Sequence, residues 1–242
     1  MMGQKRQVSR RIRERVRLEL PVRVRAMGHG GLAWEELTRL LDVSPFGARV
    51  SLSRPVEPGR LLHLTMPLPR PLRSFDHTEE QYRVWALVRN LRAASEGEAT
   101  RFEVGLAFVG KRPPASHIED PEKLYDVEHS IPGGLYEPKP KARAGRSDST
   151  RLGMAVEVEV ILLDEHGRVA QTGVTVTENL SRRGAAVYAP FRAERGGFVL
   201  LRSVQFGMEV LAAVRGCRTD ERGVTRLHLE FLDREWPLDG VE

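Results

Sequence analysis

The sequence is divided into many short segments in which apolar and polar residues alternate, with no long helical pattern between them. Residues 21–27 read PVRVRAM, the alternation of a strand with one buried and one exposed face. Such strands bury their apolar face by packing together, which favours an all-β fold. The other predicted strands are 37–41, 48–52, 61–66, 82–91 and 102–108, then 154–163, 169–177, 185–188, 198–201, 208–214 and 225–231. Each half therefore predicts a six-stranded antiparallel barrel.

Between the two halves lies a segment that is rich in proline, at positions 113, 114, 121, 132, 138 and 140. This spacing interrupts helices and strands and predicts a linker. A short helix fits residues 121–129, because proline is tolerated in a first turn. We expect three parts: a first domain with an N-terminal arginine arm (1–110), the linker (111–150) and a second domain (151–242).

The two halves resemble each other in sequence. LDVSPFGARV (41–50) lies over NLSRRGAAV (179–187), and an offset of 137 residues relates both Asp42 to Asn179 and Gly47 to Gly184. A match between turns at one offset is the signature of an internal repeat. A duplicated domain is therefore the simplest interpretation.

The charge of the chain is concentrated at one end. Of 242 residues with a net charge of +5, the first 25 hold nine basic and two acidic side chains, or +7, and the rest sum to −2. This distribution predicts a basic arm on a nearly neutral body. Because a nucleic-acid binder more often spreads its basic residues over a face, we do not expect nucleic acid as the partner.

Several classes of protein are excluded by composition. No apolar run approaches the roughly 20 residues that span a bilayer, so we expect no membrane insertion. The charged N-terminus lacks the apolar stretch of a secretory signal. The single cysteine, Cys217, has no partner for an internal disulfide, which fits a cytoplasmic protein.

Catalytic and metal-binding patterns are also missing. The seven histidines have no metal-ligand spacing, and no nucleophile elbow, phosphate loop or dinucleotide fingerprint occurs. We therefore expect no catalytic residue, metal or cofactor, and hence no enzyme. The three tryptophans are most simply residues of the core or of the barrel rims.

Two motifs stand out against this background, Arg11-Ile-Arg-Glu-Arg15 and Asp42-Val-Ser-Pro-Phe-Gly47. Ahead of and inside a small barrel pattern, they resemble the PilZ family, whose signature is R-x-x-x-R followed by [D/N]-x-S-x-x-G. Their combination in register with the strands is what makes the resemblance specific. It covers most of both halves, as a tandem of PilZ-like domains, and leaves out the linker.

The resemblance implies a bacterial receptor for cyclic di-GMP, a ligand with two phosphates and two guanines. An arginine fork fits guanine O6 and N7 or phosphate oxygens, so Arg11 and Arg15 are implied contacts, with Arg10 as a supplement. Asp42 would accept from guanine N1 and N2, Ser44 would offer a hydroxyl, and Gly47 would permit a close backbone approach.

Plainer interpretations compete with this one. The Asp42–Gly47 segment is also a good β-turn, and an arginine run is often only a solvated arm. Upstream of the second turn, arginines occur at 143, 146 and 151 without forming R-x-x-x-R, and the place of Arg15 is expected near Ser149. The possible contacts of the second half, whose role the sequence leaves open, are Arg146, Arg151, Asn179, Ser181 and Gly184.

The sequence thus predicts a cyclic di-GMP receptor that relays its state to a protein effector. The arm would fold onto the barrel when the ligand arrives, and the displayed surface or the domain orientation would change. The alternative is a ligand-independent adaptor in which both barrels dock proteins, and a second rival is nucleic-acid binding through the arm.

Overall fold

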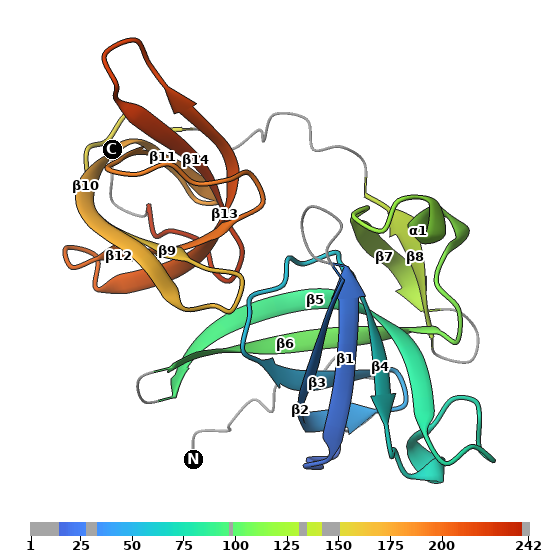
Figure 1. The fold of residues 1–242 in the computed structure, drawn as a ribbon. Coiled ribbons are helices and arrows are strands. Elements are labelled where there is room, and N and C mark those ends of the chain that lie inside the picture. The colour runs from blue at the N-terminus through green and yellow to red at the C-terminus, as the bar shows by residue number, and fades with distance from the viewer. Residues whose placement is uncertain (1–14, 28–32, 97–98, 131–134, 142–150, 239–242) are drawn as a thin grey trace, which may run out of the picture.

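The fold is known from a computed structural model that describes residues 15–27, 33–96, 99–130, 135–141 and 151–238. The first barrel contains β1 (Pro21–Met27), β2 (Ala33–Ser44), β3 (Gly47–Leu52), β4 (Leu61–Met66), β5 (Tyr82–Glu96) and β6 (Ala99–Gly110). The second contains β9 (Glu157–Leu163), β10 (Val169–Ser181), β11 (Gly184–Ala189), β12 (Phe198–Ser203), β13 (Met208–Thr219) and β14 (Thr225–Phe231). Both are closed and antiparallel (Figure 1), which confirms the predicted fold class.

The two barrels have the same topology. The strand order is β1-β2-β3-β6-β5-β4 in the first barrel, and β9-β10-β11-β14-β13-β12 follows the same path in the second. The inward residues of alternating strands fill each interior; Val22, Val24 and Val50 in the first and Val158, Val160 and Val187 in the second are fully or almost fully buried. The alternation in the sequence therefore corresponds to the inside and outside of each barrel.

The proline-rich segment contains regular structure that packs on the first barrel. A one-turn helix, α1 (Ala115–Glu119), is followed by an antiparallel pair, β7 (Tyr125–Ser130) and β8 (Tyr136–Pro140). The helix predicted at 121–129 is therefore wrong. Helix α1 begins directly after Pro114, and Tyr125 is drawn into a strand because its ring is buried against Leu61 and Leu87. One short 3-10 turn, η2 (Arg70–Leu72), lies between β4 and β5.

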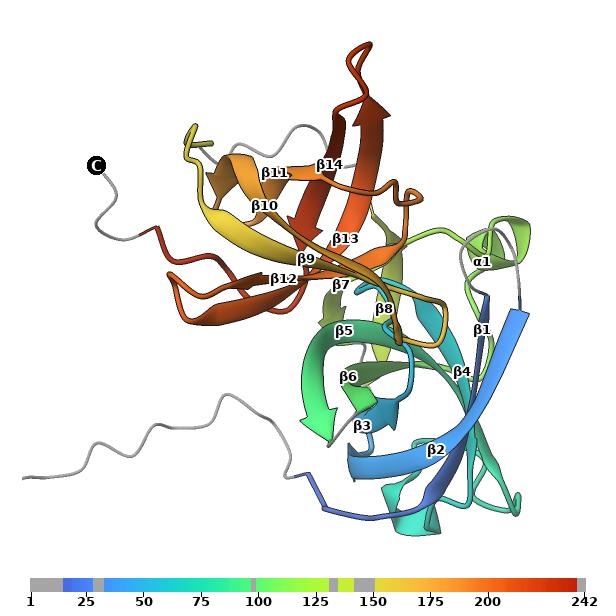
Figure 2. The same ribbon diagram turned by 60° about the vertical axis from the view of Figure 1, so that its left-hand side comes forward.

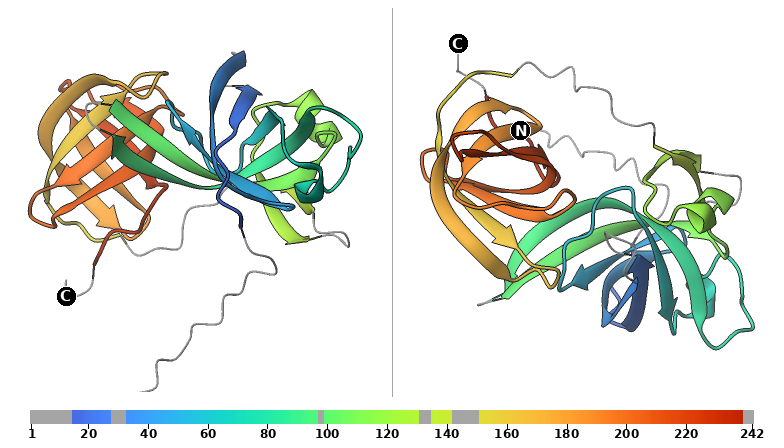
Figure 3. Two further views of the ribbon diagram at one scale, coloured as in Figure 1. Left: turned by 90° about the horizontal axis from the view of Figure 1, so that it is seen from below. Right: turned by 45° about the horizontal axis from the view of Figure 1, so that its top comes forward.

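The barrels are in close contact, and strands β5 and β6 of the first reach onto the second (Figures 2 and 3). Four aliphatic side chains of the second barrel are buried in one cluster with the core of the first: Ile161, Leu163, Leu200 and Leu211. Burying one such side chain contributes about 1.5–3 kcal/mol. The two barrels therefore share part of one apolar core.

Polar and close backbone contacts also join the two barrels at this interface. Arg215 of β13 donates to Glu57 of the first barrel at 2.5 Å and to Glu230 of its own barrel at 2.6 Å. Gly167, in the β9–β10 turn, has a φ of +71°, and a Cβ there would lie 2.4 Å from the carbonyl oxygen of Ser53. Only glycine fits this contact without strain. In the described ranges, no helix is both long enough and apolar enough to cross a bilayer.

Candidate functional site

The Asp42–Gly47 turn joins β2 to β3 of the first barrel. A bulge lies between Leu40 and Asp42, after which Asp42 is opposite Arg49 and Ser44 is opposite Gly47. A Cβ on Gly47 would lie 2.3 Å from the carbonyl oxygen of Leu106, so the close approach of β6 requires glycine. The Ser44 hydroxyl is buried inside the turn, 3.4 Å from both the Gly47 oxygen and the Phe46 nitrogen. Ser44 and Gly47 thus shape the turn.

The carboxylate of Asp42 is held between two arginines. Asp42 is only 7% exposed. Arg15 Nη1 donates to Oδ1 at 2.9 Å, and Arg49 Nε donates to Oδ2 at 2.8 Å. A nearly buried carboxylate is stable as an anion only when it is paired in this way. The turn therefore presents a charged acceptor with a guanidinium on either side.

Arg15 is positioned by the backbone next to it. Val16 and Val43 exchange two hydrogen bonds, at 2.8 and 2.9 Å, and the Leu40 amide donates to the Leu20 oxygen at 2.8 Å. The described end of the arm therefore lies along β2 as an extra extended segment. The two other arginines expected in the site, Arg10 and Arg11, lie outside the described residues.

The line of charge continues from Asp42 across the sheet. Arg49 also donates from Nη1 to Glu103 of β6 at 2.9 Å, and Glu103 is opposite Arg92 of β5. Next to Glu103 lies a cavity of about 580 Å³, whose lining includes Arg92 and, from the second barrel, Arg234. Charged side chains of both barrels therefore meet beside the turn.

A second set of contacts holds the turn from outside. Arg73 is buried and donates to the backbone oxygens of Leu68, Asp76, Glu79 and Glu80 at 2.6–3.2 Å, which folds the chain between β4 and β5 around it. From this segment Ser74 Oγ donates to the Pro45 oxygen at 2.7 Å. The segment thereby fixes the middle of the Asp42–Gly47 turn.

The second barrel repeats the backbone of this site. Its bulge lies between Thr177 and Asn179, Ser181 Oγ donates to the Gly184 oxygen at 3.0 Å, and a Cβ on Gly184 would lie 2.4 Å from the Leu229 oxygen. Leu152 and Leu180 exchange hydrogen bonds of 2.8 and 2.9 Å, as Val16 and Val43 do.

This backbone match corrects the predicted place of Arg15 in the second half. Because Leu152 takes the place of Val16, the residue before it, Arg151, corresponds to Arg15, and the expected position near Ser149 is wrong. The arm and the first strand are related at an offset of 136 residues and the turn at 137, so the extra residue of the second barrel lies between its first two strands, β9 and β10. Arg151 is exposed and has no partner among the described residues.

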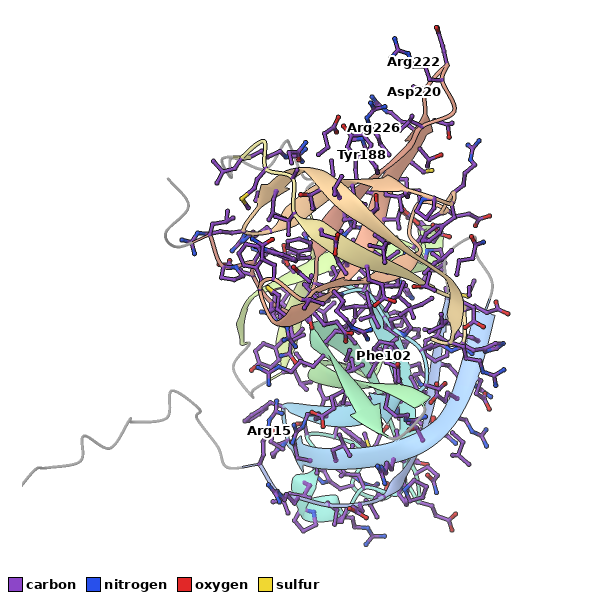
Figure 4. All side chains as sticks on the ribbon, turned by 90° about the vertical axis from the view of Figure 1, so that its left-hand side faces the viewer. Arg15, Phe102, Tyr188, Asp220, Arg222 and Arg226 are labelled. Atoms are coloured by element: carbon purple, nitrogen blue, oxygen red, sulfur yellow. The ribbon has the colours of Figure 1, made fainter. Side chains whose placement is uncertain are left out.

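The side chains of the second site lack the charges of the first. Asn179 replaces Asp42, and its buried oxygen has no hydrogen-bond partner in the described part of the chain. Arg49 and Glu103 are replaced by Ala186 and Arg226. Arg226 is 5.3 Å from the Tyr188 ring centroid and pairs with Glu178 and Asp220 at 3.1 and 2.9 Å. Figure 4 shows this cluster at the far end of the second barrel from Arg15.

Sequence reasoning missed Arg49 and Glu103. Arg49 is seven residues after Asp42 on the returning strand, a separation that a hairpin with one bulge brings into register. Glu103 lies beside it through a strand far along the chain. In the part of the chain that the structure describes, no three His, Cys, Asp or Glu side chains are grouped to hold a metal ion.

Solved structures are similar to this chain over most of its length. The Bacillus subtilis inhibitor of motility MotI/DgrA is 11% identical, with 89% of this chain and 88% of that one covered and a TM-score of 0.31. Borreliella burgdorferi PlzA, solved in complex with c-di-GMP, is 9% identical, with coverages of 93% and 90% and a TM-score of 0.28. Escherichia coli YcgR, also solved with c-di-GMP, is 14% identical, with coverages of 88% and 76% and a TM-score of 0.28.

The curated proteins gave no match. The family model described as the PilZ domain matches residues 4–120, which contain the arginine arm, the whole first barrel and helix α1. The matched residues include both motifs and the site built on them. Residues 4–120, which include the first barrel, therefore belong to the PilZ domain family.

Proposed function

We propose that this protein is a non-enzymatic receptor for cyclic di-GMP, with its site at Asp42 on the first barrel. The observation that carries the proposal is the nearly buried Asp42 carboxylate between Arg15 and Arg49, inside a domain of the PilZ family. Opposite charges side by side match the edges of a guanine, which donates from N1 and N2 and accepts at O6 and N7.

The chemistry of the pair leaves room for the ligand. An ionised carboxylate has about four acceptor positions, and the arginines use two of them. The remaining two suit the adjacent N1–H and N2–H groups of one guanine. Arg15, with Arg10 and Arg11 from the arm, would then donate to the Hoogsteen edge or to the phosphates. Ser44 and Gly47 serve by shaping the turn.

The cavity beside Glu103 gives the second barrel a part in this site. Arg92 and Arg234 line it from the two barrels together with the carboxylates of Glu103 and Asp233. Arg234 pairs with Asp233 at 3.3 Å, whereas Arg92 is exposed without a partner among the described residues. A ligand with two phosphates needs more cationic partners than the turn supplies. We assign these two arginines to the phosphates, so the second barrel forms a wall of the site.

We propose that the relay to an effector protein uses the arm and the surface of the first barrel. Residues 15–20 of the arm already lie along β2, and the barrels share an apolar core. Ligand binding would therefore act on the arm before Arg15 and on the charge line, with the barrels fixed relative to each other. The effector would read the changed surface.

Isothermal titration calorimetry with cyclic di-GMP tests the proposal. Asp42→Ala should abolish the binding heat, whereas the matched change Asn179→Ala in the second barrel should leave it unchanged. Arg15→Ala and Arg151→Ala form a second matched pair, and the melting temperature of each variant checks its fold. If the wild-type protein gives no heat, or if Asp42→Ala keeps its affinity, the receptor assignment is wrong and the adaptor alternative gains.

A further inference from the structure

The first barrel has a basic outer face on the side of β1 and its neighbours. Two rows of residues run across strands β2, β1, β4 and β5 in register. The rows are Glu35–Arg25–His63–Trp85 and Leu37–Arg23–Thr65–Arg83. Three arginines against one glutamate make this face positive. Arg23 and Arg25, which the sequence assigned to the arm, belong to it; we call these eight residues the basic face.

An aromatic pocket opens at one end of the basic face. Its volume is about 380 Å³, and the rings of Trp34, His63, Trp85 and His117 line it. The ring centroids of His63 and Trp85 are 5.2 Å apart, and those of Trp85 and His117 are 5.1 Å apart and nearly perpendicular. Such an arrangement receives an aromatic or aliphatic side chain.

The two histidine rings of the pocket are uncharged, and the paired side chains of Arg25 and Glu35 also line it. Burial lowers the pKa of His63, and the nearby charges of Arg25 and Arg83 lower it further. Burial and Arg60 likewise lower the pKa of His117. Both rings are therefore neutral at pH 7. Arg23 and Arg25 both pair with Glu35, so one glutamate is shared by two arginines, and Arg83 has no ion-pair partner among the described residues. The excess of positive charge is what would attract acidic groups.

Exposed aliphatic side chains extend the surface beyond the pocket. Leu37, in the second row, is 74% exposed, and Ile118, next to His117, is 72% exposed. A single small molecule in the pocket would leave both in water. A polypeptide with an anchor side chain in the pocket and further side chains on either side would cover them.

We propose that the basic face docks an acidic segment of an effector protein, whose aromatic or aliphatic anchor enters the pocket of Trp34 and Trp85. The surface is distinct from the ligand site, because Trp34 and Asp42 are eight residues apart on β2, about 26 Å along an extended strand. The use of this surface for relay rests on the proposed function, whereas the binding of the segment does not.

The probe for this surface is a phage-displayed library of random dodecapeptides. It is selected on the wild-type protein and counter-selected on Trp85→Ala/Arg25→Glu. Enriched peptides should combine several Asp or Glu residues with one aromatic or aliphatic anchor. By fluorescence anisotropy, a labelled peptide should bind at least ten-fold more weakly to Trp85→Ala and to Arg83→Glu, and its affinity should fall as salt is raised.

Two controls separate this proposal from the receptor assignment. Arg222→Glu makes the same charge change on the β13–β14 turn at the far end of the second barrel (Figure 4) and should leave peptide affinity unchanged. Asp42→Ala, which removes the ligand acceptor, should also leave it unchanged. No enrichment over the counter-selection, or equal binding to Arg83→Glu, overturns the proposal. So does preferential binding of a 20-nucleotide RNA to this face, or its burial in a dimer of this chain.

Discussion

The two β-turns of the repeat have the same backbone geometry but different side chains. Both follow a bulge at the same place, both close on a glycine that a neighbouring carbonyl oxygen approaches, and both carry a flanking segment bonded to the strand. In the first, Asp42 holds two arginines. In the second, Asn179 has an unpaired oxygen, and Ala186 stands where Arg49 does.

The difference shows which parts of the motif serve the fold. Glycine and serine are kept in both turns because the backbone geometry needs them, whatever is bound. The charges are present in one barrel only, so they are the part of the motif that chemistry requires. The [D/N]-x-S-x-x-G pattern alone therefore indicates the barrel, and its partners Arg15 and Arg49 distinguish the proposed ligand site.

Making the first turn resemble the second should have the largest effect. Asp42→Asn/Arg49→Ala removes the anion and one guanidinium, and we expect cyclic di-GMP affinity to fall at least 100-fold, about 2.8 kcal/mol. The reciprocal change Asn179→Asp/Ala186→Arg should create no second binding site, because the second half lacks the R-x-x-x-R arm. Calorimetry measures both, and comparable affinity of wild type and the first variant would refute the division of roles.

The two glycines should respond alike. Gly47→Ala and Gly184→Ala each place a carbon within 2.4 Å of a backbone oxygen, and we expect each to destabilise the protein by about 2–3 kcal/mol. Urea unfolding gives the two values. A glycine that tolerates alanine would show that its turn is not held by the neighbouring strand. The control is Gly153→Ala, because a Cβ at Gly153 meets open space. Gly223→Ala is unsuitable as a control, because Gly223 has a positive φ that strains alanine.

The two acceptors should differ in their contribution to stability. Asp42→Ala leaves two arginines without their carboxylate, and a loss of about 1–2 kcal/mol is expected. Asn179→Ala removes a buried oxygen that has no partner, so stability should stay within about 0.5 kcal/mol of wild type or rise. A loss above that value for Asn179→Ala would reveal a contact in the second turn.

The smallest expected difference between the two barrels is in how their stability changes in mild acid. His63 and His117 of the first unit have lowered pKa values, so below pH 6.5 the unfolded chain binds protons more readily and stability should fall. In the second barrel, burial raises the pKa of Asp233, which acts in the opposite direction when the pH falls towards 3.8. His117→Phe should reduce the change in the urea midpoint between pH 7 and pH 5, whereas Asp233→Asn should leave that change as in the wild type.

Much of the fold could be predicted from alternation, and the site only in part. Asp42 and its turn are visible in the sequence because they are contiguous. Arg49 is not, since the bulge after Leu40 decides which residue faces Asp42. The alternation of residues 21–27 predicts Arg23 and Arg25 on the exposed face of a strand, but only strand pairing shows which residues lie beside them on that face. The interface had a readable signal, because β9 ends in the apolar run ILL, which fits burial on both faces.

The shared core of the barrels has a consequence for how the protein is made. Leu200 and Leu211, which cover the first barrel, belong to strands near the end of the chain. During synthesis the first barrel emerges with that apolar area exposed to chaperones and to other nascent chains. The first barrel is complete only when the last strands have been made, so we expect damage to the second barrel to lower the yield of the whole protein.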